Sequence, residues 1–113
     1  ATNNLDKDFL EKVQSIIEKR FFEDGFTVDS LASDMYMGRT SFYNKFKDLT
    51  GITPSEYVNT YRLKLASVWL LNNDDESIAD IAMQLGFGSY NYFCRKFKEC
   101  FGVSPTQYRK EHL

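Results

Sequence analysis

The sequence predicts an all-α fold of about seven helices, in which two similar pairs of helices are joined by a long central helix. The first supporting observation is an internal repeat: residues 46–57 read FKDLTGITPSEY, and residues 97–108 read FKECFGVSPTQY. The second is that apolar residues recur every three or four positions along most of the chain, which is typical of amphipathic helices. The only two prolines occupy equivalent places in the repeat. The same small unit is therefore expected twice.

The composition predicts one compact domain in the cytoplasm, or two very small subdomains that share one core. Of the 113 residues, 42% are hydrophobic, and no apolar run approaches the ~20 residues that span a bilayer. The net charge of -2 weakly opposes nucleic-acid binding, but the acidic excess lies in residues 1–26. Because the chain opens at Ala1 without Met, we expect a larger parent protein.

The first 26 residues predict a helix from about Asp6 to Phe21 that packs on the first helix pair. Residues 27–53 predict that pair. Thr27 is a candidate N-cap for its first helix, and its second helix starts near Arg39. The side chains expected to point inward are Val28, Leu31, Ala32 and Met35 from the first helix, and Phe42, Phe46 and Leu49 from the second.

Residues 54–76 predict the connector, a helix from Pro54 to about Leu71 that is apolar on several sides, followed by a polar loop. Residues 77–113 predict the second pair and a C-terminal helix, with Ser77 and Asp80 as a candidate capping box. The two copies align with an offset of 50 residues before the turn and 51 after it, so one residue is inserted in the second turn. The side chains expected to point inward are Ile78, Ile81, Ala82, Leu85, Phe93, Phe97 and Cys100.

Each helix pair has the arrangement of a helix-turn-helix reader of the DNA major groove. The outer side of each second helix carries no acid, and its side chains are Arg39, Thr40, Tyr43, Asn44 and Lys47 in the first copy and Tyr90, Asn91, Cys94, Arg95 and Lys98 in the second. Asn can pair with adenine, Arg with guanine, and Lys can neutralise phosphate. The helix N-termini near Arg39 and Ser89 add backbone donors for phosphate. We expect Asp29, Asp34 and Asp80, on the preceding helices, to lie away from this side.

Two alternatives stay open at this point. Repeated helix pairs also suit an all-α protein-interaction module that makes no direct DNA contact. An enzyme that uses Cys94 as a nucleophile has little support, because no neighbouring base or zinc-ligand set accompanies it. Cys94 is expected at the surface, Cys100 in the core, and both are expected to be reduced. With His112 as the lone imidazole, we expect no metal, no cofactor and no catalytic residue.

The second copy, IADIAMQLGFGSYNYFCRKFKECFGVSPTQYR (residues 78–109), closely resembles the signature of the AraC-type (AraC/XylS) transcription regulators. Residues 28–71 are similar to the less regular first unit of the same domain. The resemblance implies two helix-turn-helix units whose second helices enter successive major-groove segments, about one helical turn or ~34 Å apart. It implies base reading by Thr40, Tyr43, Asn44, Tyr90, Asn91, Cys94 and Arg95, and phosphate contacts by Arg39, Lys47 and Lys98.

The resemblance also implies a function and partners. The expected function is sequence-specific binding of double-stranded DNA for transcription regulation, with RNA polymerase as a further expected partner and no membrane contact from this segment. The helix before Thr27 is similar to what precedes this domain in response regulators and hybrid sensor kinases. We therefore expect the output domain of a larger, two-component regulator that has a sensor or receiver domain.

Overall fold

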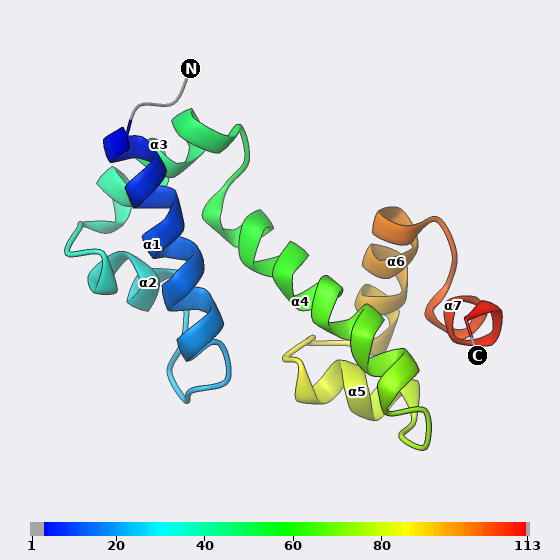
Figure 1. The fold of residues 1–113 in the computed structure, drawn as a ribbon. Helices are drawn as coiled ribbons and strands as arrows, with labels where there is room; N and C mark the ends of the chain where they lie inside the picture. Colours follow the sequence, from blue (N-terminus) through cyan, green and yellow to red (C-terminus); the bar gives the residue numbers. More distant parts are fainter. Residues whose placement is uncertain (1–3, 113) are drawn as a thin grey trace. The chain divides into compact units, whose positions relative to one another are not determined.

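In the computed structural model, residues 4–112 form seven α-helices and no β-strand (Figure 1). The helices are α1 (Asn4–Arg20), α2 (Val28–Asp34), α3 (Arg39–Thr50), α4 (Pro54–Asn72), α5 (Ile78–Gln84), α6 (Tyr90–Phe101) and α7 (Pro105–Glu111). The predicted all-α class and number of helices are confirmed. Residues 1–3, at the start of the first predicted segment, and residue 113, at the end of the last, lie outside the described residues. No helix among those described is long and apolar enough to cross a membrane.

The chain divides into two compact units, residues 1–58 and residues 59–113. The division falls inside α4, so the first turn of this helix belongs to the first unit and the rest belongs to the second. In each unit, one helix precedes a helix-turn-helix pair. This helix is α1 before α2 and α3, and it is the later part of α4 before α5 and α6.

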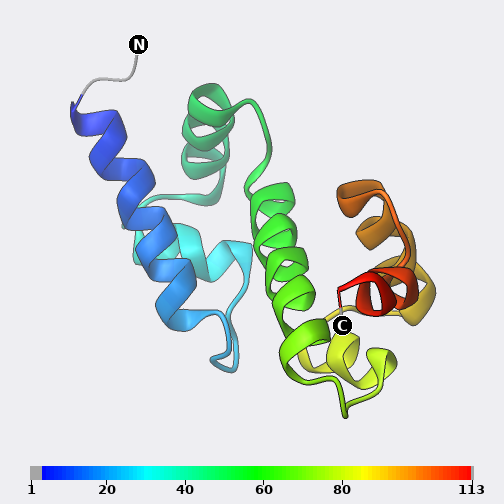
Figure 2. The ribbon, with the colours of Figure 1, turned by 45° about the vertical axis from the view of Figure 1, so that its right-hand side comes forward.

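In the first unit, α1 packs against α2, and α2 packs against α3 (Figure 2). Phe9 and Ile17 of α1 are buried because they lie on one side of the helix. The ring of Phe9 lies 6.0 Å from the ring of Phe42 in α3. Thr27 caps α2 as predicted, since its hydroxyl accepts the backbone N–H of Ser30 at 3.0 Å. These contacts hold α3 with its apolar side against α1 and α2.

In the second unit, α5 packs against α6, and α6 packs against α7. The core is formed by Leu70 of α4, Ile81 of α5, and Phe93 and Phe97 of α6, all fully buried. For the predicted capping box at the start of α5, the structure shows the bond from the Asp80 N–H to the Ser77 hydroxyl. The apolar side of α6 is thereby fixed toward the interior, as the apolar side of α3 is in the first unit.

The turns differ in length as the repeat offset predicts: residues 35–38 separate α2 from α3, and residues 85–89 separate α5 from α6. Both turns contain a residue in the left-handed region, Tyr36 with φ 57° and Gly86 with φ 90°. Glycine adopts this conformation without a steric penalty, whereas tyrosine does not. The first turn is therefore the strained version of the second.

One predicted core residue is wrong. Cys100 is exposed, although the sequence placed it on the inward side of α6. The reason is that the next residue, Phe101, lies against the core instead, with its ring 4.5 Å from that of Phe97 and 5.6 Å from that of Tyr108. Cys94, which the sequence placed at the surface, is half-buried.

Candidate nucleic-acid interface

The outer side of α3 carries the predicted polar residues in an exposed position. Thr40, Asn44 and Lys47 are exposed, and Tyr43 exposes 40% of its surface. On the opposite side of the same helix, Phe42 is 1% exposed. The Nζ of Lys47 lies 5.8 Å from the centre of the Tyr43 ring, so a cation–π contact joins the two side chains one turn apart. The structure thus brings these four residues together on one accessible surface.

Arg39, a predicted phosphate contact, is paired with an acid of the preceding helix. Its Nη1 lies 3.2 Å from Asp29 Oδ2, and both side chains are largely exposed. The expectation that Asp29 lies away from this surface is therefore wrong, because the short turn leaves α2 within reach of the long Arg39 side chain. Asp34 pairs instead with Arg20 of α1. The exposed ion pair between Arg39 and Asp29 is weak, so Arg39 can exchange Asp29 for another anion.

The outer side of α6 carries the second predicted set. Asn91, Arg95 and Lys98 are exposed, and Tyr90 exposes 45% of its surface. Cys94 lies half-buried beside Tyr90. Phe93, on the opposite side of the helix, is fully buried. Five side chains of the second unit therefore share one helix side, of which Cys94 is the least accessible.

Tyr92, which is not among the residues predicted from the sequence, lies beside Arg95. The Arg95 Cζ lies 5.5 Å from the centre of the Tyr92 ring, and the Lys96 Nζ lies 5.8 Å from it. The spacing of three and four residues on a helix is the signal that could have identified these pairs. The ring restricts the Arg95 side chain before any ligand is bound, which lowers the entropy cost of a later contact.

The N-termini of the two outer helices differ. The hydroxyl of Ser89 caps α6 and accepts the backbone N–H of Tyr92 at 3.0 Å. Gly38 occupies the same position before α3 and has no side chain with which to cap the helix. Ser89 therefore has a structural role that the sequence did not assign, while its hydroxyl hydrogen is still able to donate to an anion.

Tyr90 lies beside Cys94 on the outer side of α6. A side-chain hydrogen bond with Cys94 raises the pKa of Tyr90 above its ordinary value, and desolvation acts in the same direction. A neutral phenol can donate a hydrogen bond to a phosphate oxygen, whereas a phenolate would be repelled by it. The neutral phenol of Tyr90 therefore suits an anionic partner.

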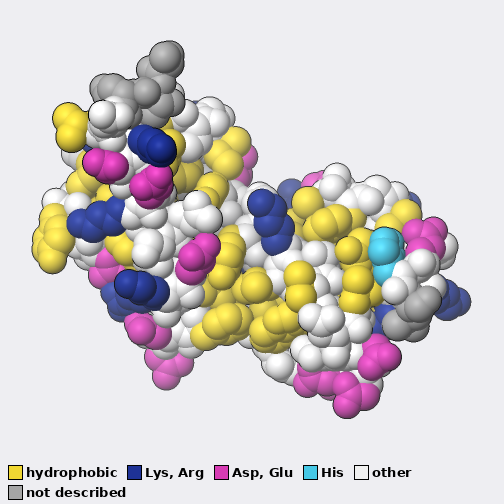
Figure 3. Space-filling view, viewed as in Figure 1, with side chains coloured by type: hydrophobic (Ala, Val, Ile, Leu, Met, Phe, Trp, Pro, Cys, Tyr) yellow, Lys and Arg dark blue, Asp and Glu magenta, His cyan; other side chains and the backbone are white. Residues whose placement is uncertain are grey.

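Basic side chains do not form a continuous field. On the face that Figure 3 shows, Lys and Arg side chains of the first unit are interspersed with Asp and Glu. Among the described residues, no group of three or more His, Cys, Asp and Glu side chains could hold a metal ion.

Residues 31–111 match a protein family described as a helix-turn-helix domain. The chain is 32% identical over 110 residues to the histidine kinase P4 of Formosa agariphila, covering 97% of this chain and 8% of that protein. It is 34% identical over 106 residues to the HTH-type transcriptional regulator MtrA of Neisseria gonorrhoeae, covering 94% and 34% respectively. The chain thus spans about a third or less of the length of these curated relatives.

Two solved structures have the same fold. One is a transcriptional regulator from Chromobacterium violaceum described as containing an AraC-type DNA-binding domain, with a TM-score of 0.83, 26% identity, and 96% of each chain covered. The other is the DNA-binding domain of the global transcriptional factor AdpA in complex with a target DNA. Its TM-score is 0.75 and its identity 31%, with 92% of this chain and 91% of that chain covered.

Proposed function

The chain belongs to the AraC-type family of helix-turn-helix DNA-binding domains, and from this premise we propose that α3 and α6 read successive major-groove segments of one duplex. The activity is sequence-specific binding of double-stranded DNA for transcription regulation. It is a binding function, and no step of chemistry is assigned to any side chain. The two helix-turn-helix units supply one recognition helix each.

One observation carries this proposal. The first nine residues of both helices that follow the turns, Arg39 to Lys47 in α3 and Tyr90 to Lys98 in α6, contain no Asp or Glu, although the chain as a whole carries a net charge of -2. Asp29, which reaches Arg39, belongs to the preceding helix and is paired there. A surface that merely contacts solvent has no reason to exclude acids on both copies. A surface that approaches phosphates does, because each carboxylate there would be repelled.

The side chains divide into two roles. We assign base reading to Thr40, Tyr43 and Asn44 of α3 and to Tyr90, Asn91, Cys94 and Arg95 of α6. Asparagine presents a donor and an acceptor that match adenine, and Arg95 presents two donors that match guanine. We assign phosphate contacts to Arg39, Lys47, Ser89 and Lys98, which fix the position of each helix without reading sequence.

We further propose that this domain is the output part of a larger cytoplasmic regulator. The support is that relatives such as the histidine kinase P4 are much longer than this chain of 113 residues. A sensor or receiver domain would then control when the DNA is bound. One relative is named a virulence regulon transcriptional activator. If this regulator also activates transcription, we expect it to contact RNA polymerase.

The experiment is a selection of bound duplexes from a random pool, followed by titration of the selected sequence. We expect one recurring sequence, which the Asn91→Ala variant binds more weakly than the unchanged chain does. The control is Lys110→Ala, an exposed change in α7 outside the assigned surface. An interaction module without DNA contact would instead yield no enriched sequence, and that outcome would overturn the proposal.

A further inference from the structure

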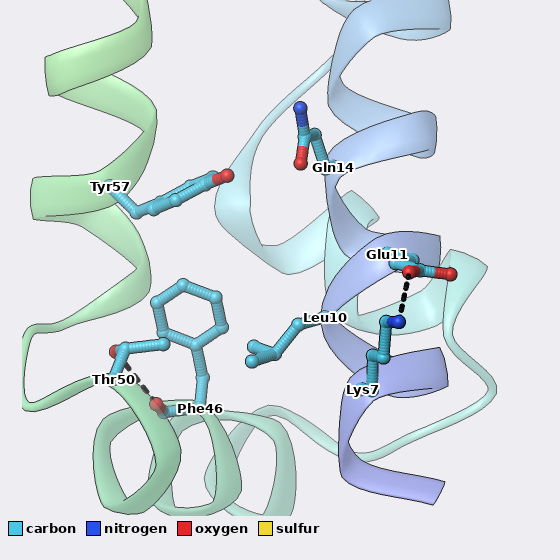
Figure 4. A pocket seen from close by; sticks show the side chains of 7 residues that line it. All are labelled: Lys7, Leu10, Glu11, Gln14, Phe46, Thr50 and Tyr57. Atoms are coloured by element: carbon cyan, nitrogen blue, oxygen red, sulfur yellow. Dashed lines mark hydrogen bonds and ion pairs between the residues drawn. The ribbon is translucent and has the colours of Figure 1, made fainter. Parts of the chain in front are cut away.

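A cavity of about 380 Å³ lies within the first unit, between α1, α3 and the first turn of α4 (Figure 4). Its apolar walls are Leu10, Phe46 and Tyr57. Figure 4 shows the Leu10 side chain pointing from α1 toward the Phe46 ring, and the Tyr57 ring extending from α4 toward α1. From α3 the cavity is lined by Phe46 and Thr50, and none of its lining residues is among those assigned to DNA. It is therefore a separate feature of the first unit.

The internal repeat shows what fits against these walls. Phe46 and Tyr57 correspond to Phe97 and Tyr108 of the second unit, at the offset of 51 residues. Both pairs have ring centres 5.3 Å apart in an edge-to-face arrangement. In the second unit, a further ring covers the pair: that of Phe101, at 4.5 Å from Phe97 and 5.6 Å from Tyr108. In the second unit, the ring pair of Phe97 and Tyr108 is thus covered by a side chain of the protein itself. We call this ring pair, and its equivalent Phe46 and Tyr57, the aromatic platform.

In the first unit, the position of Phe101 is taken by Thr50. Threonine has no ring, and the Thr50 hydroxyl turns back to donate to the backbone oxygen of Phe46 at 2.8 Å. The platform of Phe46 and Tyr57 is therefore left uncovered on the side where Phe101 would lie, and the cavity borders Thr50. The cavity of the first unit thus borders the position at which the second unit has an aromatic side chain.

The rim limits the charge of an occupant. Lys7 and Glu11 of α1 both border the cavity, and their charged atoms lie 4.0 Å apart. One cation and one anion that already pair give no net preference for a charged ligand. Gln14, also at the rim, donates its amide N–H to Glu18 at 3.1 Å and can accept a hydrogen bond with its amide oxygen. The volume falls within the range of small-molecule sites, roughly 300–1,000 Å³.

We propose that this cavity binds a small, uncharged aromatic molecule of one or two rings. Its ring rests on Phe46 and Tyr57 as the ring of Phe101 rests on Phe97 and Tyr108. A single polar substituent, such as a hydroxyl or a ring N–H, reaches Gln14. The bound molecule contacts α1, α3 and α4 at once, so it stabilises the first unit by an amount that grows with the logarithm of its concentration above the dissociation constant.

The test is a titration of the 113-residue chain with phenol and indole, followed by backbone amide NMR shifts. Cyclohexanol, which has the hydroxyl of phenol but no aromatic ring, is the matched control. We expect saturable shifts at Leu10, Gln14 and Thr50, with a dissociation constant on the order of 1 mM for a ligand this small, and weaker binding of cyclohexanol. Shifts that do not saturate, or that are the same for cyclohexanol, would overturn the proposal.

Two variants locate the site. Thr50→Phe supplies the ring from within the chain, as Phe101 does, and is expected to abolish the shifts. Thr50→Ser keeps the hydroxyl and leaves the cavity open, so it should retain them. If Thr50→Phe does not fold, Thr50→Met fills the same space with a more adaptable side chain. Binding that persists in a folded, filled variant would contradict the assignment. DNA affinity is measured without ligand, so either proposal can fail alone.

Discussion

At the scale of single residues, the two turns show how the same backbone is made by different side chains. Gly86 has φ 90°, and a Cβ added to it would lie 3.5 Å from the Nε of Arg62. The Arg62 Nε donates to the Leu85 carbonyl at 2.7 Å, and burial lowers the pKa of Arg62 while it stays a cation. Tyr36 accepts the left-handed conformation in the first unit, with its ring 5.2 Å from the Lys12 Nζ.

The Gly86→Ala variant is expected to lower the free energy of unfolding by about 1–2 kcal/mol, since alanine at positive φ is strained. Urea denaturation of the second unit's helices measures this change. Gly88→Ala is the matched control, because a Cβ at Gly88 meets nothing within 4 Å and needs no positive φ. Equal losses for both variants would show that the turn conformation is not the cause.

The pair of Asp29 and Arg39 leads to a second prediction at this scale. In Asp29→Asn, the Arg39 guanidinium loses its partner at 3.2 Å and becomes free to contact phosphate. DNA affinity should rise several-fold at low salt, by a similar factor for specific and unrelated duplexes, and the gain should shrink at high salt. Fluorescence anisotropy against both duplexes measures it. Asp75→Asn, an exposed change in the loop before α5, should have no comparable effect; an equal gain there would point to net charge alone.

At the scale of helices, Arg109 adds three hydrogen bonds to the ring contacts by which α7 packs on α6. Arg109 donates to the carbonyls of Leu70, Glu76 and Asn73 at 2.8, 2.9 and 3.1 Å. These three acceptors lie at the end of α4 and in the loop after it, so Arg109 joins α7 to the segment that leads into α5. A planar guanidinium can reach three such acceptors, whereas a lysine ammonium on a flexible chain cannot match the geometry.

Arg109→Lys should therefore destabilise the second unit by about 2 kcal/mol, the range of hydrogen bonds made by charged groups. Thermal unfolding followed by circular dichroism measures the change. Lys110→Ala, at the exposed neighbouring position, should leave the midpoint nearly unchanged. An Arg109→Lys variant as stable as the unchanged chain would mean that the three bonds add little in water.

Substitutions in the recognition helices α3 and α6 should change either the base preference or the overall DNA affinity. Arg95→Ala removes a candidate guanine contact, so it should cost about 1–3 kcal/mol on the preferred sequence and relax the choice at one base pair. Lys47→Ala removes a candidate phosphate contact, so it should weaken all sequences alike. Competition titrations with single-base variants of the selected duplex separate the two. A base-selective loss for Lys47→Ala would contradict its assignment.

The sequence predicted the helices well because their caps and apolar spacing are local signals. The bounds of α1 and α4 were within two residues of those observed, and Phe42 and Phe93 are buried as expected. The errors are contacts between helices. The Phe101 ring packs on Phe97 and Tyr108 while Cys100 is exposed, and the reach of Arg39 to Asp29 depends on how α2 and α3 pack. Periodicity within one helix contains no information about either.

At the scale of the whole molecule, the repeat was the most informative feature. Its offset predicted two helix-turn-helix units and the extra residue in the second turn. The positions at which the two copies differ are equally informative. Thr50 borders a cavity in the first unit, whereas at the equivalent position of the second unit the Phe101 ring packs on Phe97. The difference is visible in the sequence, but its consequence depends on the packing of α1, which only the structure shows.

The most direct test of the central claim is a hydroxyl-radical footprint of the chain on its selected duplex. We expect two protected stretches on one side of the duplex, separated by about one helical turn, or 10 base pairs. Asn44→Ala should weaken only one stretch, and Asn91→Ala only the other. A single protected stretch that both variants weaken equally would contradict reading by two helices.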